Sequence, residues 1–312
     1  RGRQRCRTGR GLRAESTGMP YREVVEAARS HPGRFIEVER HPDVRSAVIR
    51  LIEPDLMNPL SPPLLIQLID NIDDLTADPE LRSIILTGTD PGFCVGGDFR
   101  VMQTAIDAMR IPVPEGAVGI WRFIRYLFGG IARRIVRSDQ AFIAAVNGET
   151  AGVGWAFTLA SDHIICSDRA KIVPAFSRLG LVPEVGTSWL LTRRLGYQGA
   201  LDLYTSGEVV DGEKAVEIGL AQRCVPHQEL IEASLDRARG FAELPGHALQ
   251  MAKPMLRQAA DMTWEQAITM EEFAEPLTFT TEHFAQIISS LRPEDGGRDN
   301  PGWPPSAWES GQ

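Results

Sequence analysis

Two glycine-rich turns are the first parts of the sequence whose residues could do chemistry. The segments FCVGGD (93–98) and NGETAGVG (147–154) each lie between a predicted buried strand and a predicted helix. Backbone N–H groups at the start of a helix have no partner within it, and the helix dipole favours negative charge there. Two such groups that converge on one carbonyl oxygen form an oxyanion hole, in which each donor contributes roughly 2.7–4 kcal/mol. Taken singly, either segment is only a tight turn, and neither has dinucleotide-binding spacing.

Glu184 is a carboxylate with unusual neighbours. It is the only ionisable residue of LGLVPEVGTSWLL (179–191), where apolar and small residues flank it. Apolar surroundings raise the pKa of a carboxyl toward the range in which a general base works near neutral pH. In the alternative interpretation, the carboxylate only stabilises the start of the helix that follows it. Glu184 is therefore the candidate acid–base residue, with a structural role left open.

Short apolar runs alternate with helical patterns around these residues. Ser61 and Pro62 are suited to begin a helix over 61–79, whose apolar residues form one stripe. Residues 105–138 form an excursion that ends in a helix weakened at Gly129–Gly130, and the pattern is helical from about residue 196 onward. The predicted strands, of which the first two make a hairpin, are 35–40, 46–53, 82–88, 141–148, 163–168 and 170–175. The sequence therefore predicts an α/β fold with a C-terminal helical region.

Composition and charge limit the possible partners. The chain of 312 residues is 43% hydrophobic, and its net charge is −8. Residues 1–18 carry six arginines against Glu15, a net of +5, so the other residues carry −13. An acidic body disfavours nucleic acid and anionic membranes as partners. The four cysteines are scattered without metal-ligand or disulfide spacing, so we expect a reduced, cytoplasmic protein with no metal. Residues 1–18 are predicted to be a disordered basic tail and 291–312 a flexible one.

Several motifs in order resemble one family. MNPLSPP with FCVGGDF, FIAAVNGETAGVGWAFTLASDHIICSD, GLVPEVGTSWLLTRRLG and LYTSGEVVDGEKAVEIGLAQRCVP are similar to signatures of the crotonase (enoyl-CoA hydratase/isomerase) superfamily. The resemblance covers residues 35–275. It implies a core of ββα spiral turns over 19–205 and a helical trimerisation region over 206–290. It also implies an acyl-CoA thioester substrate, no other cofactor, and assembly as homotrimers or hexamers of paired trimers.

The resemblance also assigns a site. The family's two oxyanion donors fall on the backbone N–H groups of Val95 and Val153, and the side chain of Val153 would narrow the acyl pocket. The residues that it implies around the substrate are Met57, Val95, Gly96, Gly97, Asp98, Gly152, Val153, Trp155 and Phe176.

Hydratases and isomerases of the family differ in the positions of their catalytic acids. The two glutamates with which its hydratases position water fall on Ala156 and Phe176, so hydration by that mechanism is disfavoured. Glu184 matches the single carboxylate of the Δ3,Δ2-enoyl-CoA isomerases, and the ring-opening phenylacetyl-CoA isomerases have an aspartate there. The resemblance thus implies a CoA-thioester isomerase. The alternatives are a hydratase-like or other crotonase reaction, such as thioester or C–C hydrolysis or decarboxylation, and a non-catalytic acyl-CoA-binding protein.

Recognition of the CoA phosphates is the part of the family pattern that this chain matches least. The family often has a basic residue shortly before the MN pair, whereas Asp55 stands there in this chain. Arg100, a neighbouring subunit, or the helical residues Lys253 and Arg257 are the alternatives that the sequence offers.

Overall fold

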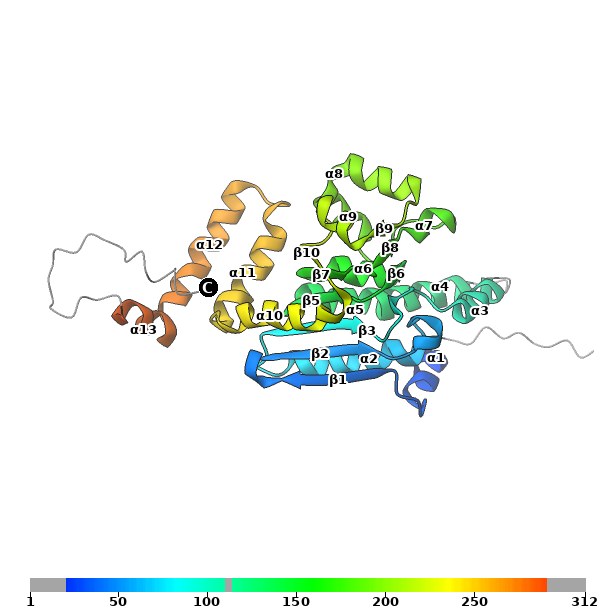
Figure 1. Ribbon diagram of the computed structural model, residues 1–312, viewed down its shortest axis with the longest axis horizontal. Helices are drawn as coiled ribbons and strands as arrows, with labels where there is room; N and C mark the ends of the chain where they lie inside the picture. The colour runs from blue at the N-terminus through cyan, green and yellow to red at the C-terminus, as the bar shows by residue number, and fades with distance from the viewer. Residues whose placement is uncertain (1–20, 110–113, 291–312) are drawn as a thin grey trace, which may run out of the picture.

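A six-stranded sheet forms the centre of the fold (Figure 1). The structure is a computed structural model and describes residues 21–109 and 114–290. The strands β1 and β2 form an antiparallel hairpin, as predicted, and the other neighbouring strands are parallel. In sheet order, the strands are β1 (Ile36–His41), β2 (Ser46–Leu51), β3 (Ser83–Gly88), β5 (Ala141–Val146), β7 (His163–Ser167) and β10 (Arg223–Val225).

A second, four-stranded sheet makes the repeating unit of the fold visible. Its strands are β4 (Gly92–Cys94), β6 (Glu149–Ala151), β8 (Lys171–Val173) and β9 (Val210–Asp211). Each of β4, β6 and β8 directly follows a strand of the first sheet and directly precedes a helix. These helices are α3 (Phe99–Met109), α6 (Val153–Ala160) and α7 (Ala175–Arg178). The predicted spiral of ββα units is therefore confirmed.

Helices cover one face of the six-stranded sheet and bury the larger hydrophobic core. The helix predicted over residues 61–79 is observed as α2 (Pro62–Thr76). It begins at Pro62 and buries the expected apolar stripe, including Leu64, Leu68 and Ile72. Ser61 is its N-cap residue by position, but its side chain makes no capping hydrogen bond. The helix α1 (Tyr21–Arg29) packs against α2.

The excursion before β5 is mostly helical. It contains α4 (Pro114–Arg122), a π-helix η3 (Phe123–Phe128) and α5 (Gly129–Arg137). The π-helix ends directly before Gly129 and Gly130, where the sequence predicted a weakened helix. Single π turns frequently occur at functional sites, and this one buries Leu127 and Phe128.

The core continues beyond the boundary predicted at residues 205/206. The helix α8 (Thr187–Ser206) is kinked at Gly196 (φ 71°). The chain then returns to both sheets, because β9 pairs with β8 and β10 pairs with β7. The helix α10 (Leu230–Ala242) covers the other face of the central sheet, where Ala238 and Phe241 join a second apolar cluster. The remaining elements of this stretch are α9 (Gly212–Glu217) and the 3-10 turn η4 (His227–Glu229).

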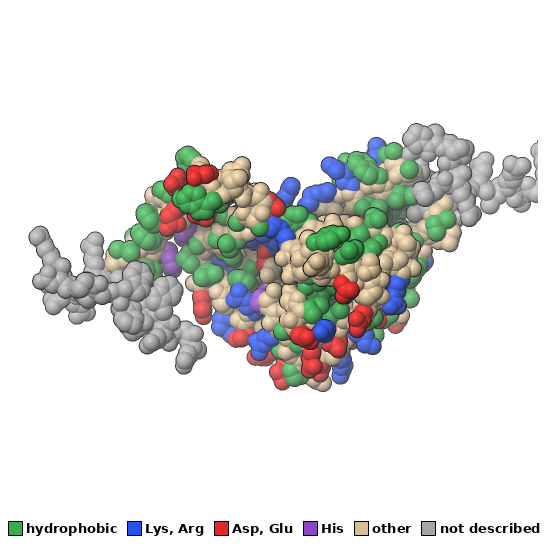
Figure 2. Space-filling view, turned by 90° about the horizontal axis from the view of Figure 1, so that it is seen from above, with side chains coloured by type: hydrophobic (Ala, Val, Ile, Leu, Met, Phe, Trp, Pro, Cys, Tyr) green, Lys and Arg blue, Asp and Glu red, His purple; other side chains and the backbone are tan. Residues whose placement is uncertain are grey.

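Three helices end the described part of the chain (Figure 1). The first, α11 (Gly246–Ala259), is joined to the body through Lys253 and Arg257, whereas α12 (Trp264–Phe279) and α13 (Glu282–Ser290) stand apart from it. Hydrophobic side chains gather on this outlying part (Figure 2), and Phe273 is 78% exposed. The tails predicted at 1–18 and 291–312 lie outside the described residues. Within the described residues, no helix is long and apolar enough to cross a membrane, and no cluster of side chains could hold a metal ion.

Candidate active site

Backbone hydrogen bonds clamp the first glycine turn against the loop before α2. This loop includes a 3-10 turn, η2 (Pro54–Leu56), and the left-handed residue Met57 (φ 57°). The N–H of Val95 donates to the carbonyl oxygen of Met57 (3.2 Å), and the N–H of Leu60 donates to that of Gly96 (2.7 Å). Leu60 also forms a parallel bridge with Gly97. The turn is therefore held from one side along its whole length.

The second glycine turn lies directly against the first. A Cβ atom added to Gly96 would lie 2.8 Å from the carbonyl oxygen of Ala151 and 3.3 Å from the amide nitrogen of Val153. A Cβ atom added to Gly154 would lie 2.2 Å from the carbonyl oxygen of Cys94. Only glycine allows two backbones to approach so closely. The structure thus brings the two turns together, as an oxyanion hole requires.

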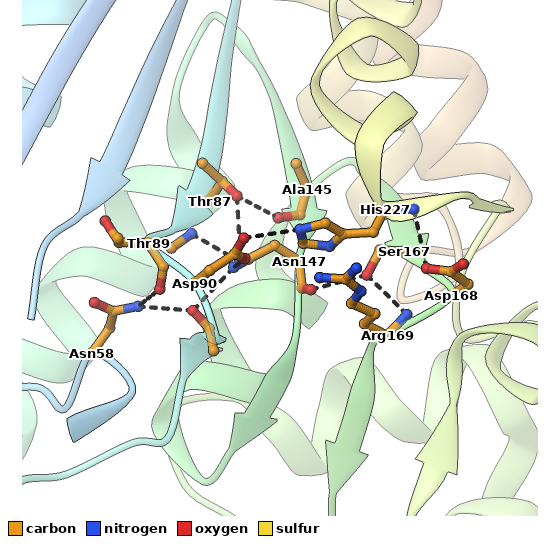
Figure 3. A network of polar contacts seen from close by, with 12 residues as sticks. Asn58, Thr87, Thr89, Asp90, Ala145, Asn147, Ser167, Asp168, Arg169 and His227 are labelled. Carbon is orange, nitrogen blue, oxygen red and sulfur yellow. Dashed lines mark hydrogen bonds and ion pairs between the residues drawn. The ribbon is translucent and has the colours of Figure 1, made fainter. Parts of the chain in front are cut away.

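Two buried asparagines fix the chain at the start of β4 (Figure 3). The side-chain amide of Asn58 donates to the carbonyl oxygens of Thr89 and Gly92, both at 2.8 Å. That of Asn147 donates to Asp90 Oδ1 (2.9 Å) and also to the Gly92 carbonyl oxygen (3.2 Å). In the same network, His227 Nε2 lies 2.9 Å from Asp90 Oδ2, which ties the loop after β10 to the end of β3. These contacts make the scaffold beneath both turns rigid.

Val95, which the sequence predicts as the first oxyanion donor, already has a backbone hydrogen bond. Its N–H is already paired with the carbonyl oxygen of Met57. The described residues include no acceptor for the N–H of Gly97, two positions further along the same turn, or for that of Val153 at the first position of α6. Because an N–H without a partner is available for a ligand, Gly97 and Val153 are a second candidate pair of donors. Gly152, with φ 52° and ψ −124°, allows the chain to turn sharply into α6.

The side chains of Met102 and of Phe128, one of the aromatic residues of the excursion, lie beside Gly97. A Cβ atom added there would meet Met102 Cε at 2.8 Å and Phe128 Cζ at 3.7 Å. Phe128 belongs to the π-helix and is buried, so the aromatic excursion reaches the first turn. The spacing of aromatic residues in the excursion could have indicated a contact with the site, but the same spacing is equally typical of ordinary helix packing.

Glu184 lies in a strained turn before α8. The turn is closed by the N–H of Thr187, which donates to the Glu184 carbonyl oxygen (2.9 Å). Its two central residues, Val185 (φ 58°) and Gly186 (φ 87°), are both left-handed. A β-branched residue is rare in this region because its Cβ substituents crowd the backbone. The side chain of Val185 packs against the larger of the two apolar core clusters.

The carboxylate of Glu184 is isolated and partly buried. Burial raises its pKa above the ordinary value of a glutamate, and the described residues offer its side chain no hydrogen bond or ion pair. A carboxylate whose main role was to stabilise the start of α8 would have a lowered pKa. Desolvation is therefore the stronger effect here, as expected for a general base.

This burial predicts a gain in stability when the charge is removed. A raised pKa in the folded state means that the ionised form is disfavoured there, so stability falls as pH rises from the unfolded-state pKa through the folded-state pKa. Above that window, Glu184→Gln should have a larger free energy of unfolding than the wild type, and the difference should disappear in acid. Denaturant unfolding at pH 4 and pH 8 measures this. Equal stability of the two proteins at pH 8 would contradict the burial of the charge.

The positions of the two hydratase acids are apolar and buried. Ala156 and Phe176 are both buried in the interior. Neither side chain can bind water or carry a proton.

The basic residues considered for CoA are all paired within the chain. Arg100 donates to both oxygens of the buried Asp98 and to Glu53 Oε1 (3.1 Å), and Asp98 also accepts from the Arg100 backbone N–H. Lys253 and Arg257 both bind Asp162, at 2.8 and 2.7 Å. Asp55 is exposed. Lys253 and Arg257 are therefore structural residues, which the sequence could not tell from phosphate ligands.

We expect Lys253→Met to weaken the fold but not substrate binding. The Lys253 ammonium also donates to the carbonyl oxygens of Ile135 (3.2 Å) and Gln140 (2.7 Å) in the interior. Removing one partner of such a buried pair costs about 3–5 kcal/mol. Urea unfolding should show this loss, whereas Lys214→Met, at an exposed pair, should change little. A large rise in KM for an acyl-CoA with unchanged stability would instead make Lys253 a ligand for CoA.

Comparisons with known proteins agree with this architecture. A family described as enoyl-CoA hydratase/isomerase matches residues 45–290. The chain is 28% identical over 243 residues to the 1,2-epoxyphenylacetyl-CoA isomerase of Escherichia coli, covering 78% of this chain and 90% of that protein. It is also 28% identical to a putative enoyl-CoA hydratase of Thermus thermophilus, covering 73% and 87%. The crystal structure of a putative enoyl-CoA hydratase from Streptomyces coelicolor superposes with a TM-score of 0.74 at 27% identity, covering 84% and 94%.

Proposed function

Because the chain belongs to the enoyl-CoA hydratase/isomerase family, we propose that it is an isomerase that shifts the double bond of an enoyl-CoA thioester through an enolate. The observation that carries this proposal is the isolated, partly buried carboxylate of Glu184. The relatives include both isomerases and hydratases by name, so the choice between these reactions rests on the residues of the site.

The proposed reaction needs one acid–base group and two hydrogen-bond donors. The thioester oxygen accepts from the N–H groups of Gly97 and Val153. The Glu184 carboxylate removes a proton from C2 of a 3-enoyl thioester, and the negative charge moves onto the thioester oxygen as the enolate forms. The protonated Glu184 then returns the proton to C4, which leaves a 2-enoyl thioester of unchanged mass. The two donors contribute roughly 2.7–4 kcal/mol each at the enolate stage.

The buried apolar residues at the hydratase positions support isomerisation over hydration. Adding water to a 2-enoyl thioester requires a group that orients the water and a group that protonates C2. Ala156 and Phe176 can do neither, and Glu184 alone supplies one carboxylate. The same single carboxylate is sufficient for a proton transfer between two carbons of one substrate.

Turnover of a small thioester panel tests the proposal. The 3-enoyl-CoA thioesters should gain the absorbance of a conjugated thioester without a change in mass, and the 2-enoyl-CoA thioesters should not gain water. Addition of water to a 2-enoyl-CoA thioester would mean that the protein is a hydratase and not an isomerase. Release of free CoA or carbon dioxide would indicate another reaction of the family, and binding without turnover would indicate a non-catalytic protein.

We also propose that the protein acts as a cytoplasmic homotrimer or as a hexamer of paired trimers. The outlying helices α12 and α13 support this, because a monomer would leave their apolar side chains in water. Trp264 and Phe273 are exposed, and a hollow of 720 Å³ between α11 and α12 is lined by Met262 and Met270. Sedimentation equilibrium measures the mass of the assembly, and a monomer at micromolar concentration would overturn this proposal.

A further inference from the structure

The strands that lead into the two glycine turns begin side by side. Gly92, the first residue of β4, is the pairing partner of Glu149, the first residue of β6. A Cβ atom added to Gly148 would collide with the carbonyl oxygen of Pro91, so the segment before β4 lies directly against the segment before β6. A shift of either segment therefore moves the other, together with the turns to which both strands lead.

The side chain of Asp90 joins these two segments (Figure 3). Its Oδ1 accepts from the side-chain amide of Asn147 (2.9 Å), which also donates to the carbonyl oxygen of Gly92 (3.2 Å). The side-chain oxygen of Asn147 accepts from the backbone N–H of Gly88 (3.1 Å). Asn147 lies two residues before β6, and its amide is held on both sides. The position of Asp90 therefore determines how Asn147 is held at the start of the second turn.

His227, the first residue of η4, holds Asp90 from the other side. The Asp90 side chain is 58% exposed, so without a second contact its carboxylate could rotate into water. His227 Nε2 lies 2.9 Å from Asp90 Oδ2, and the histidine side chain is only 15% exposed. The backbone N–H of His227 donates to Asp168 Oδ1 (3.0 Å), which fixes the loop that carries the ring. Both carboxylate oxygens of Asp90 are thus held.

The Asp90 carboxylate is ionised in this arrangement. Partial burial would raise the pKa of Asp90, but the hydrogen bonds from Asn147 and His227 and the nearby charge of Arg169 bring its pKa below the ordinary value. An ionised carboxylate only accepts hydrogen bonds, so His227 Nε2 must carry a proton and donate it. The direction of each hydrogen bond around Asp90 is therefore fixed.

The other ring nitrogen indicates that His227 contributes more to geometry than to stability. Among the described residues, His227 Nδ1 is buried and has no hydrogen-bond partner. Burying a polar atom without a partner is unfavourable, and an ion pair to a carboxylate as exposed as that of Asp90 stabilises a fold little. The consequence of the contact is the fixed position of Asp90.

We propose that His227 is a positioning residue for the reaction, which acts through Asp90 and Asn147 on the strands β4 and β6 and so aligns the oxyanion donors of the two turns. The proposal rests on the proposed function for the reaction itself. It adds a residue that lies 137 positions from Asp90 in the chain and comes from the loop after β10. Alignment of this kind affects the rate, because a displacement of about 1 Å at a site can cost roughly 10²-fold.

Replacement of His227 tests the proposal. His227→Leu should lower kcat for a 3-enoyl-CoA thioester by about 5- to 30-fold, below the loss expected for a full displacement. KM should change less than about twofold, because oxyanion donors act mainly on the transition state. The urea midpoint of unfolding should change little. His227→Gln, whose side-chain amide can donate to Asp90, should restore kcat to within about threefold of the wild type.

A matched control separates positioning from a general loss of stability. Lys253→Met removes a buried partner of Asp162 and should lower the urea midpoint more than His227→Leu does, yet keep kcat close to that of the wild type. An equal loss of kcat in Lys253→Met would overturn the proposal, because any weakening of the fold would then have the same effect.

A double variant tests the route through Asp90. If His227 acts through this carboxylate, the variant that combines His227→Leu with Asp90→Ala should be no slower than Asp90→Ala alone. Losses that multiply in the double variant, an undiminished kcat in His227→Leu, or a loss that His227→Gln does not restore would overturn the proposal alone. If the wild type converts no thioester, the proposed function fails and this inference fails with it.

Discussion

Glu184→Gln should lower kcat for a 3-enoyl-CoA thioester by about 10²–10⁴-fold, the usual contribution of a general acid–base residue. Glutamine has nearly the same shape as glutamate but cannot accept the C2 proton. We expect KM to change little, because the thioester is held mainly by the backbone N–H groups of Gly97 and Val153. The measurement is the initial rate of formation of the conjugated thioester, followed by absorbance.

A matched variant separates a loss of chemistry from a loss of charge. Glu149→Gln changes another acid near the turns, which lies in β6 at the start of the second turn. This variant should keep kcat within a few-fold of the wild type. Circular dichroism should show that both variants are folded. A Glu184→Gln variant with undiminished kcat, or a Glu149→Gln variant that loses activity instead, would remove Glu184 from the mechanism.

Gly154→Ala should strongly destabilise the fold. The added methyl group would lie 2.2 Å from the carbonyl oxygen of Cys94 and 2.8 Å from its Cβ atom, so the two turns would have to separate. Overpacking in a rigid interior costs typically about 1–3 kcal/mol, and we expect a loss at or above the top of this range because backbone atoms block the way. Any folded fraction should also lose activity, since separation of the turns moves the Val153 N–H away from Gly97.

Denaturant unfolding measures this prediction against Gly119→Ala. A Cβ atom added to Gly119, in α4, would meet nothing within 4 Å. Alanine is favoured over glycine in a helix by about 1 kcal/mol, so this control should be neutral or slightly more stable. If Gly154→Ala unfolds at the same denaturant concentration as the wild type, the two turns do not meet as closely as we describe.

The regular parts of the fold could be predicted from the sequence because their patterns are local. The apolar stripe of α2 and the hairpin of β1 and β2 follow from periodicity and turn residues, and both are confirmed. The end of the core was predicted too early. The strands β9 (Val210–Asp211) and β10 (Arg223–Val225) are too short to show a strand pattern among helices. They become recognisable only through their pairing with β8 and β7.

The site was predictable in its parts but not in its details. The glycine turns predict N–H groups that converge, yet which N–H is free depends on the carbonyl oxygen that Met57 presents from 38 positions before Val95. Likewise, Lys253 and Arg257 have the sequence context of phosphate ligands, and only the position of Asp162 shows that they are already paired. Long-range contacts of this kind leave no periodic signal in the sequence.

Transfer of an isotope between the two carbons tests the central claim most directly. A 3-enoyl-CoA thioester that carries deuterium at C2 would be converted in ordinary water, and the product would be examined for deuterium at C4 by mass spectrometry and NMR. If Glu184 carries the proton from C2 to C4, part of the deuterium appears at C4 in the wild type, and Glu184→Gln forms this product far more slowly. A product that has gained water, or deuterium transfer at an equal rate in Glu184→Gln, would contradict the assignment of Glu184 as the single acid–base residue of an isomerase.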